Sequence, residues 1–407
     1  MQKAVTTYIV SCFILCTVVL VNGQIDTTLT NLNYKDLVLV KKAIKNKNTQ
    51  FVPAYNALIK QADKALLEGP FSVLQKKGLA ASGDKHDYLS LAPYWWPDPE
   101  KEDGLPWIRK DGKVNPMTKG DNVDDPVKDK MVNNVQVLSL AYFFTGKKRY
   151  ARKVNELLKV WFVDKATRMN PNLDHAQGIP GKNSGRGFGI IEFSGVAHLI
   201  TAIEILEHNK AMPKNVKAGL EDWLNEYTAW LQNSEFGIFE KTRSNNHGSL
   251  YDAQLVSLLL FLNRKEEAKS VLNSVFDERI APQIEADGSQ PHELKRTKGL
   301  TYSILNLSAL NRLAFYGKKV GVDIWGKHSE EGDIQKAYDF LFPYLDENNT
   351  WPYEQLGDMD KALERLRRLF VNSGSMLGIS NHCTIAPQLK DIEDIQQLMY
   401  PCIAEIR

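Results

Sequence analysis

The sequence predicts an all-α fold in which about six to seven helical hairpins close into an (α/α) toroid with long, cleft-forming loops. Two observations support this: about a dozen stretches carry apolar residues at helical spacing, and no alternating apolar and polar pattern typical of strands competes with them. The stretches are residues 37–44, 55–67, 127–144, 150–163, 190–207, 212–232, 248–262, 266–280, 300–315, 333–345, 361–371 and 392–403.

Helical hairpins joined by short turns also build solenoids. The sequence contains no fixed-period repeat of the tetratricopeptide kind. Long irregular stretches, at about 72–125 and 169–187, separate different hairpins, and loops of such length are unusual unless they are functional. We therefore favour a toroid whose loops build a cleft at one end. Because no Ser/Gly-rich linker divides the chain, we expect a single domain over residues 24–407.

The N-terminus has the pattern of a secretory signal. Lys3 precedes an apolar run over residues 8–21, with small residues before Gln24, which predicts a signal peptide over residues 1–23. Residues 9–12 also resemble a lipoprotein cleavage box, a less favoured interpretation because most of the apolar run follows them. The run is short for a membrane span and no second one exists. We expect an exported protein, periplasmic or secreted.

Four cysteines occur in the sequence. Cys12 and Cys16 would leave with the signal. Cys383 and Cys402 would remain, and they could form one disulfide in an exported protein or stay as free thiols. Two cysteines are too few for a disulfide-stapled scaffold, so the hydrophobic core must stabilise the fold.

Composition narrows the class of partner. With 407 residues and 43% hydrophobic content, the chain can bury a large core. The net charge of +2 provides no global field for nucleic acid or an anionic membrane, although a locally basic cleft remains possible. We expect neither a nucleic-acid partner nor a membrane span, and the oligomeric state is open.

The first polar cluster is Asn245-Asn246-His247, directly before an apolar helical run. Tyr251 and Gln254 follow His247 by four and seven residues, which places them on its face of the helix. Polar groups crowded at the start of a buried helix suit a turn that points into a substrate cleft. The alternative is a helix N-cap at Ser244 or Asn245, with an ordinary hydrogen-bonded histidine.

The second cluster spans residues 287–302. Arg296 and neighbouring lysines offer a seat for a carboxylate or phosphate, and Tyr302 begins the next apolar helix. The alternative is a solvated basic loop followed by a core tyrosine with its hydroxyl hydrogen-bonded.

Aromatic residues mark the first irregular stretch. Tyr94, Trp95 and Trp96 are consecutive, with His86 and Trp107 nearby. Flat aromatic faces stack well on sugar rings, but loop tryptophans can equally plug a gap in a toroid, and both interpretations stay open.

The segment from Gly185 to Gly189 holds Arg186 among glycines at a helix start. Its spacing is wrong for a dinucleotide-binding loop and no strand precedes it. It is either a flexible loop or a substrate contact.

Signatures of metal, nucleophile and phosphate sites are missing from the sequence. His382-Cys383 is a lone pair that we interpret as structural, and nothing marks Asp124-Asp125 as the carboxylates of a glycosidase. We expect neither a metal nor a cofactor.

Taken together, four segments resemble the alginate-lyase domain of exported bacterial polysaccharide lyases, families 5 and 38. Their joint order is more specific than any one of them. They are residues 88–99, 168–173, 245–254 and 287–302. The resemblance implies an (α/α) toroid and β-elimination of a 1,4-linked uronic-acid glycan, either alginate (polymannuronate) or glucuronan, so the implied partner is an anionic polysaccharide.

The same resemblance implies roles for individual residues. Asn246 and His247 match the family's asparagine-histidine pair, Arg296 its arginine and Tyr302 its tyrosine. Asn246 and Arg296 would then bind the substrate carboxylate, and Tyr302 would be the acid. Tyr302 would also be the base when proton and leaving group share a face. Otherwise His247 would be the base, or it would neutralise charge.

One spacing departs from the family pattern. In the mannuronate-cleaving lyases of family 5 the arginine and tyrosine stand seven apart, about two helical turns. Here Arg296 and Tyr302 stand six apart, and Lys295 has the seven-residue spacing. Because Gly299 weakens a helix at this point, we expect Arg296 to lie in the loop before the helix. The departure leaves the polymer open, including the glucuronan of family 38.

Two other functions stay open. A glycoside hydrolase on a similar toroid would need facing carboxylates in the cleft. A non-catalytic glycan-binding protein would keep the tryptophans but tolerate loss of Tyr302.

Overall fold

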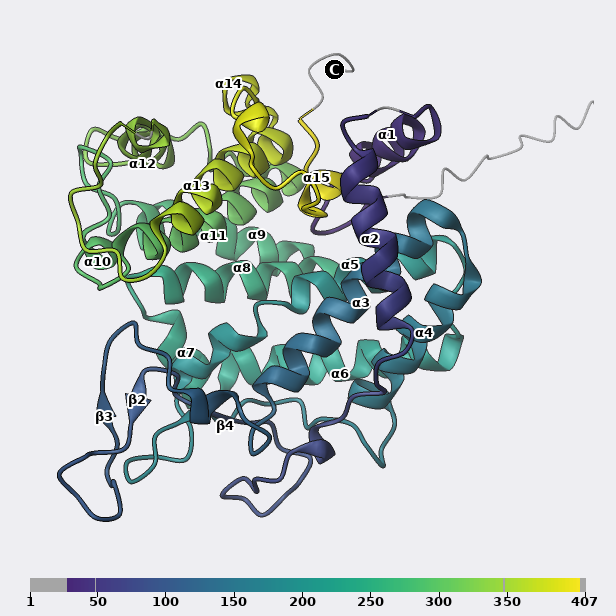
Figure 1. Ribbon diagram of the computed structural model, residues 1–407, viewed down its shortest axis with the longest axis vertical. Coiled ribbons are helices and arrows are strands. Elements are labelled where there is room, and N and C mark those ends of the chain that lie inside the picture. The colour runs from purple at the N-terminus through teal and green to yellow at the C-terminus, as the bar shows by residue number, and fades with distance from the viewer. Residues whose placement is uncertain (1–27, 48, 347, 403–407) are drawn as a thin grey trace, which may run out of the picture.

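The computed structural model describes residues 28–47, 49–346 and 348–402 (Figure 1). The predicted signal over residues 1–23, with Cys12 and Cys16, lies outside the described residues.

Helices form most of the described chain, as the apolar spacing predicts. The long ones are α1 (Tyr34–Lys45), α2 (Val52–Ala65), α3 (Asp125–Thr145), α4 (Lys148–Leu158), α5 (Val196–His208), α6 (Lys214–Asn233), α7 (Glu235–Lys241), α8 (Asn246–Phe261), α9 (Lys265–Val275), α11 (Gly299–Val320), α12 (Ile334–Leu341) and α13 (Met359–Ser373). Single-turn helices are α10 (Pro291–Leu294), α14 (Ser380–Cys383) and α15 (Gln396–Met399).

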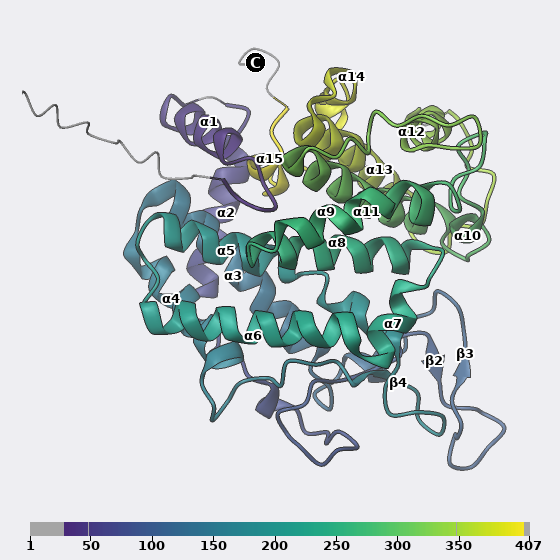
Figure 2. The same ribbon diagram turned by 180° about the vertical axis from the view of Figure 1, so that it is seen from behind.

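The helices form a toroid in which one set lies inside another. Along the inner set α3 contacts α5, α5 contacts α8, α8 contacts α11 and α11 contacts α13. The outer helices α4 and α9 pack against α3 and α8. The last described helix, α15, contacts both α1 and α2, so the first and last described helices lie side by side (Figures 1 and 2). The predicted (α/α) toroid is confirmed.

Burial explains why these sequences take these positions. In α8 almost every residue from Asn246 to Leu259 is buried, which is typical of a helix surrounded by others. In α4 only one stripe is buried, at Tyr150, Val154, Leu157 and their neighbours, so its other face meets solvent. The buried side chains of all layers form one main hydrophobic cluster that extends from Leu29 to Met399.

Short strands join the two long irregular stretches. β1 (Leu89–Leu91) pairs in parallel with β4 (His175–Gly178), and β2 (Trp95–Trp96) pairs antiparallel with β3 (Ile108–Arg109). Figures 1 and 2 place β2, β3 and β4 together at one end of the toroid, beside α7. Strands of two to four residues are too short for an alternating pattern, so the sequence did not predict them.

Two other differences concern helices. Of the helix expected over residues 392–403, the described part ends at residue 402, and within it only Gln396–Met399 is an α-helix, with Pro401 just beyond. The cysteine pair left open above is a disulfide in the structure, joining Cys383 to Cys402 beside this segment. The sequence also did not predict α7, which precedes the first polar cluster, or α10, which lies within the second.

One described helical stretch, residues 187–208, is long and apolar enough to cross a membrane by length and composition. Of its most apolar window, 72% is buried inside the protein, as expected for a core helix of a toroid.

Candidate active site

The first polar cluster lies at the start of α8. Asn245 is the N-cap residue by position, but its side chain makes no capping hydrogen bond. Glu293 of α10 accepts hydrogen bonds from the backbone N–H and the side-chain Nδ2 of Asn246, both at 2.7 Å. A carboxylate at a helix N-terminus satisfies free N–H groups and suits the helix dipole. The expected cap by Asn245 is therefore wrong, and Glu293 caps the helix from another element.

Glu293 also connects the two polar clusters. It is buried, and burial raises the pKa of its carboxyl, while the hydrogen bonds from Asn246 and the charges of His247 and Arg296 oppose that shift. The side chains of His247 and Arg296 therefore both lie near this one carboxylate. The structure brings together the asparagine, the histidine and the arginine that the sequence placed in separate clusters.

His247 is held on two sides. Its Nδ1 lies 2.5 Å from Oε1 of Glu240, a buried residue of α7. Its ring meets the edge of Phe188, with 4.9 Å between ring centroids. A carboxylate on Nδ1 selects the tautomer with the proton on that nitrogen and leaves Nε2 for other partners.

Arg296 lies between α10 and α11, so the prediction that it stands in a loop before the helix is confirmed. Its Nε and Nη2 contact the two carboxylate oxygens of Asp111 at 3.1 and 2.8 Å, and Nη2 also lies 3.1 Å from the hydroxyl of Tyr302. The guanidinium stacks over the Tyr302 ring at 4.1 Å. Lys295 instead is exposed, with Nζ 3.4 Å from Nδ1 of His292.

Tyr302 occupies the first turn of α11 and is 9% exposed. Its hydroxyl donates to the hydroxyl of Tyr94 at 2.8 Å and accepts from Arg296. Burial, and after it the neighbouring Tyr94, raises the pKa of Tyr302 well above its usual range, against the opposing charge of Arg296. At neutral pH the phenol carries its proton.

Asp111 anchors the loop after β3 to this cluster. It binds Arg109 at 2.6 Å as well as Arg296, and it accepts from the hydroxyl of Thr297 at 3.1 Å. Partial burial acts in the other direction, but hydrogen bonds from Arg296 and Arg109 hold the pKa of Asp111 well below its usual range. Gly112 permits the approach, because its φ is +69° and an added Cβ would lie 2.5 Å from Oγ1 of Thr297.

Arg186 joins the site through an aromatic contact. Its guanidinium donates to the carbonyl and the side-chain oxygen of Gln177 at 3.1 and 2.7 Å, and it lies 5.0 Å from the Phe188 ring that contacts His247. Burial, followed by repulsion from Arg109, lowers the pKa of Arg186 to about 10. Arg186 therefore lies on the histidine side of the site, and its contact with substrate stays a prediction.

The aromatic loop packs against the toroid and also keeps partly exposed aromatic surface. Trp95 packs on a small cluster that includes Trp107, which supports the plug. Lysines lie over both indoles, Lys182 over Trp95 at 4.2 Å and Lys110 over Trp96 at 5.2 Å, and both tryptophans stay partly exposed. Stacking on a sugar remains a prediction for these two.

Three predicted substrate contacts lie elsewhere. Tyr251 is 2% exposed and donates to the carbonyl of Leu231, and Gln254 is 3% exposed and binds the Tyr227 hydroxyl, so both belong to the core around α8. Tyr251 and Gln254 do follow His247 along α8, as predicted, but other helices surround α8, so these side chains do not face a cleft. His86 has Nδ1 2.6 Å from the carbonyl of Arg168, away from the Tyr302 cluster, in the packing of one loop on another.

Four charged residues of the site were not predicted from the sequence, namely Arg109, Asp111, Glu240 and Glu293. Glu293 could have been predicted, because it stands three residues before Arg296, within the second polar cluster. The other three contact the site only because separate loops and helices meet there, and no local pattern in the sequence reports that.

A groove of about 610 Å³ begins at Tyr94 and Tyr302 and follows α11 and α13. Four cationic side chains line it, namely Lys298, Lys361, Arg365 and Arg368. The one acid of the lining, Asp358, caps α13 through the backbone N–H of Lys361. The groove therefore favours an anionic ligand.

Comparison with known proteins agrees with this geometry. The sequence matches the alginate lyase family model over residues 72–351. An alginate lyase from Bacteroides ovatus has a crystal structure that superimposes with a TM-score of 0.88 at 36% identity, covering 92% of this chain and 100% of that one.

More distant structures share the fold. A tyrosine-to-phenylalanine variant of alginate lyase A1-III, complexed with a tetrasaccharide, gives a TM-score of 0.57 at 13% identity, covering 92% of this chain and 96% of that chain. A histidine-to-alanine variant of the same lyase, also complexed with a tetrasaccharide, gives a TM-score of 0.52 at 16% identity. The match covers 83% of this chain and 88% of that chain. A search of curated proteins found no match.

Proposed function

Because this chain belongs to the alginate lyase family and is a polysaccharide lyase, we propose that it cleaves alginate by β-elimination with Tyr302 as the proton donor. The observation that carries the proposal is the position of the Tyr302 hydroxyl, 3.1 Å from Arg296 and 2.8 Å from Tyr94 where the basic groove begins. The Tyr302 phenol lies beside the Arg296 guanidinium, at the start of a groove that favours an anionic ligand. This arrangement suits acid catalysis on a uronate substrate.

Elimination begins at C5 of the uronate ring, whose proton is weakly acidic because a carboxylate is attached to the same carbon. The charge that develops on that carboxylate must be stabilised. Arg296 uses Nε and Nη2 for Asp111 and Tyr302, so its Nη1 donors remain for the substrate carboxylate. Asn246 has a second amide N–H beyond the one donated to Glu293.

The step balances in protons and electrons. A base removes the C5 proton, the electron pair forms the C4–C5 double bond, and the C4–O bond breaks. The departing oxygen takes the proton of Tyr302. The products are one chain with a 4,5-unsaturated uronate and one with a new reducing end, and the tyrosine then recovers its proton.

The base depends on the face of the sugar. When the proton and the leaving oxygen lie on opposite faces, His247 takes the proton at Nε2, since Glu240 holds Nδ1. When they share a face, Tyr302 must first lose its proton to solvent; the phenolate, stabilised by Arg296 at 3.1 Å, then takes the C5 proton and gives that same proton to the departing oxygen.

Export to the periplasm or the medium completes the proposal. The signal pattern before Gln24 predicts it, and the disulfide between Cys383 and Cys402 supports it because disulfides persist in oxidising compartments.

The carboxylates of this end of the toroid do not favour a hydrolase. Asp111 is paired with two arginines and Glu293 caps α8. Asp124 pairs with Lys76. A hydrolase needs one carboxyl group free to donate a proton and a second to attack or to activate water.

The test is incubation of the purified protein with polymannuronate, polyguluronate, glucuronan and neutral mannan. We expect ultraviolet absorbance of an unsaturated product from an alginate block and none from mannan. Absorbance from glucuronan alone would contradict the alginate assignment. New reducing ends without that absorbance would indicate a hydrolase, and binding without either would indicate a glycan-binding protein.

A further inference from the structure

A second hollow adjoins the groove of the candidate active site. Its volume is about 380 Å³, and it shares Ser308, Leu369, Asn372 and Gln396 with the groove that holds Tyr302. The two spaces therefore abut in the middle of the toroid. Pockets that bind small molecules begin at about 300 Å³, so one sugar residue fits.

The hollow contains a cation without a counter-ion. Arg312 of α11 lines it, and no hydrogen bond or ion pair joins its guanidinium to another residue of the described chain. Asp394, the acid of the lining, binds Arg368 at 2.8 Å. A half-buried guanidinium without an acceptor favours binding of an anion.

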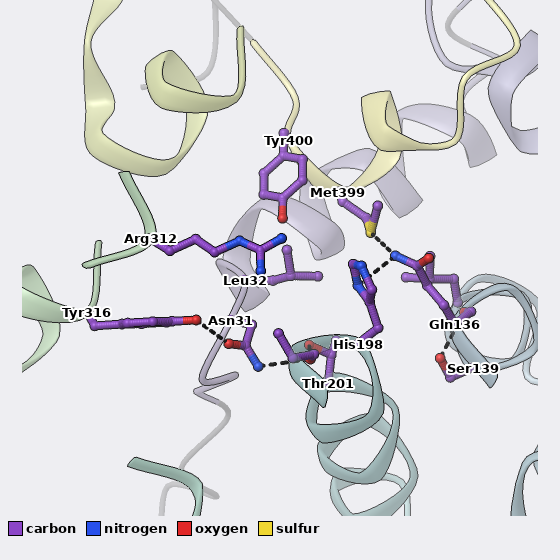
Figure 3. A pocket seen from close by; sticks show the side chains of 12 residues that line it. Asn31, Leu32, Gln136, Ser139, His198, Thr201, Arg312, Tyr316, Met399 and Tyr400 are labelled. Carbon is purple, nitrogen blue, oxygen red and sulfur yellow. Dashed lines mark hydrogen bonds between the residues drawn. The ribbon is translucent and has the colours of Figure 1, made fainter. Parts of the chain in front are cut away.

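Further donors surround Arg312. The Tyr400 side chain lines the hollow as well, and Figure 3, drawn at the narrow pocket that adjoins the hollow, shows the Arg312 guanidinium and the Tyr400 hydroxyl both pointing into that pocket. Gln136 donates from Nε2 to Nδ1 of His198 at 2.9 Å, so the ring proton of a neutral His198 is on Nε2. Burial, and then the charge of Arg312, lowers the pKa of His198 to about 4, so the ring stays neutral at pH 7 and Arg312 provides the positive charge.

Acceptors for hydroxyl groups are present as well. The side-chain oxygens of Asn311 and Asn372 line the hollow, are buried, and have no hydrogen-bond partner among the described residues. Asn311 is 2% exposed and gives its Nδ2 to Tyr338. The Arg312 guanidinium can bind a carboxylate, and the two free amide oxygens can accept hydrogen bonds from hydroxyl groups. The hollow therefore suits a ligand that has both kinds of group.

Beyond Arg312 the space narrows. Where Leu32, His198 and Tyr316 line it, the free volume is about 10 Å³ (Figure 3). That volume holds at most a water molecule, so a sugar chain cannot continue in this direction.

We propose that Arg312 seats the carboxylate of one terminal uronate residue of the substrate, in a pocket at the inner end of the groove. The identity of the ligand rests on the proposed function, whereas the anion site rests on Arg312, Asn311 and the narrowing beyond them. The pocket makes the enzyme recognise a chain end.

The test is titration calorimetry of trimannuronate into the Tyr302→Phe protein, which cannot cleave it. Adding Arg312→Met weakens binding at least tenfold, because one charge-assisted hydrogen-bonded pair is lost, and Arg312→Lys restores part of the affinity. Arg152→Met, which removes one charge from the exposed face of α4, has no effect. Carboxyl-reduced trimannuronate binds the two Arg312 forms equally. Affinity for trimannuronate unchanged by Arg312→Met, or an equal loss for the reduced sugar, overturns the proposal.

A second measurement needs no change at Arg312. In crystals of the Tyr302→Phe protein soaked with trimannuronate, we expect a terminal carboxylate in hydrogen-bonding distance of Arg312. A bound trisaccharide with every carboxylate elsewhere overturns the proposal. Failure of the proposed function is distinguishable, since wild-type protein would then form no unsaturated product whatever these experiments show.

Discussion

The hydroxyl of Tyr302 lies 2.8 Å from the hydroxyl of Tyr94, although 208 residues separate them in the chain. Tyr94 belongs to the aromatic loop and Tyr302 to the first turn of an inner helix. Because Tyr302 donates in this bond, Tyr94 holds the Tyr302 hydroxyl in place where the groove begins. Tyr94 also raises the pKa of that phenol.

Tyr94→Phe removes the acceptor and keeps the ring. We expect kcat to fall about fivefold with a smaller change in KM, since one neutral hydrogen bond contributes about 1 kcal/mol. The alkaline limb of the pH profile moves to lower pH, because the pKa of Tyr302 falls. Tyr55→Phe in α2 is the matched control. An unchanged kcat, or an alkaline limb at higher pH, contradicts this role.

Arg296→Lys tests which cation binds the substrate carboxylate. A lysine cannot contact Asp111 and Tyr302 together through a planar fork, so we expect kcat/KM to fall about a hundredfold, or about 2.7 kcal/mol. Lys295→Met, at the family's seven-residue spacing, stays within about twofold because Lys295 is exposed. A larger loss from Lys295→Met than from Arg296→Lys would reverse the assignment.

Glu240→Gln tests whether Glu240 positions His247. The amide keeps the size of the side chain but can donate to Nδ1, which allows the other tautomer. We expect kcat to fall about 10- to 100-fold, as for other partners that orient a histidine, with KM little changed. Nitrogen NMR of the histidine side chains should show Nδ1 of His247 losing its proton. Glu235→Gln, exposed on the same helix, should change neither quantity. An unchanged tautomer with reduced kcat would indicate a merely structural effect.

Glu204 makes stability depend on pH. Burial, and weakly Glu207, raises its pKa to about 7 against hydrogen bonds from Thr30, while the unfolded value is 4.5. Between these values the folded protein binds more protons than the unfolded chain, so the free energy of unfolding falls as pH rises, and the loss is complete above about pH 7. The shift corresponds to about 3 kcal/mol.

Glu204→Gln should remove that component. Urea unfolding at about pH 5 and pH 8 should show wild type losing about 2 kcal/mol more than the variant over the interval. Glu226→Gln, exposed on α6, should behave as wild type. Identical pH dependence in wild type and Glu204→Gln would show that this carboxyl titrates normally.

Helical periodicity was enough to predict the fold. The stripe at Tyr150, Val154 and Leu157 marks an outer helix, and the nearly continuous burial of α8 marks an inner one. The helix predicted over residues 392–403 is shorter in the structure. Apolar spacing reports only local periodicity, whereas Pro401 and the disulfide at Cys402 constrain the backbone there.

The site could be predicted only where the resemblance named its residues. The carboxylate of Glu293 lies near Asn246, His247 and Arg296. Arg296 in turn contacts the hydroxyl of Tyr302. Their partner Asp111 comes from the loop after β3, and their partner Glu240 comes from α7, which the sequence did not predict. The prediction that Tyr251 and Gln254 contact substrate is wrong. Helical spacing shows which residues share a face of α8, but it does not show which other helices cover that face.

The most direct test of the account is Tyr302→Phe. The variant lacks only the hydroxyl, so its circular dichroism and Tm should match wild type, while formation of unsaturated product from polymannuronate falls at least about a thousandfold. A folded variant that still produces the ultraviolet absorbance of the unsaturated uronate at a rate within tenfold of wild type would contradict the central claim that Tyr302 protonates the leaving oxygen.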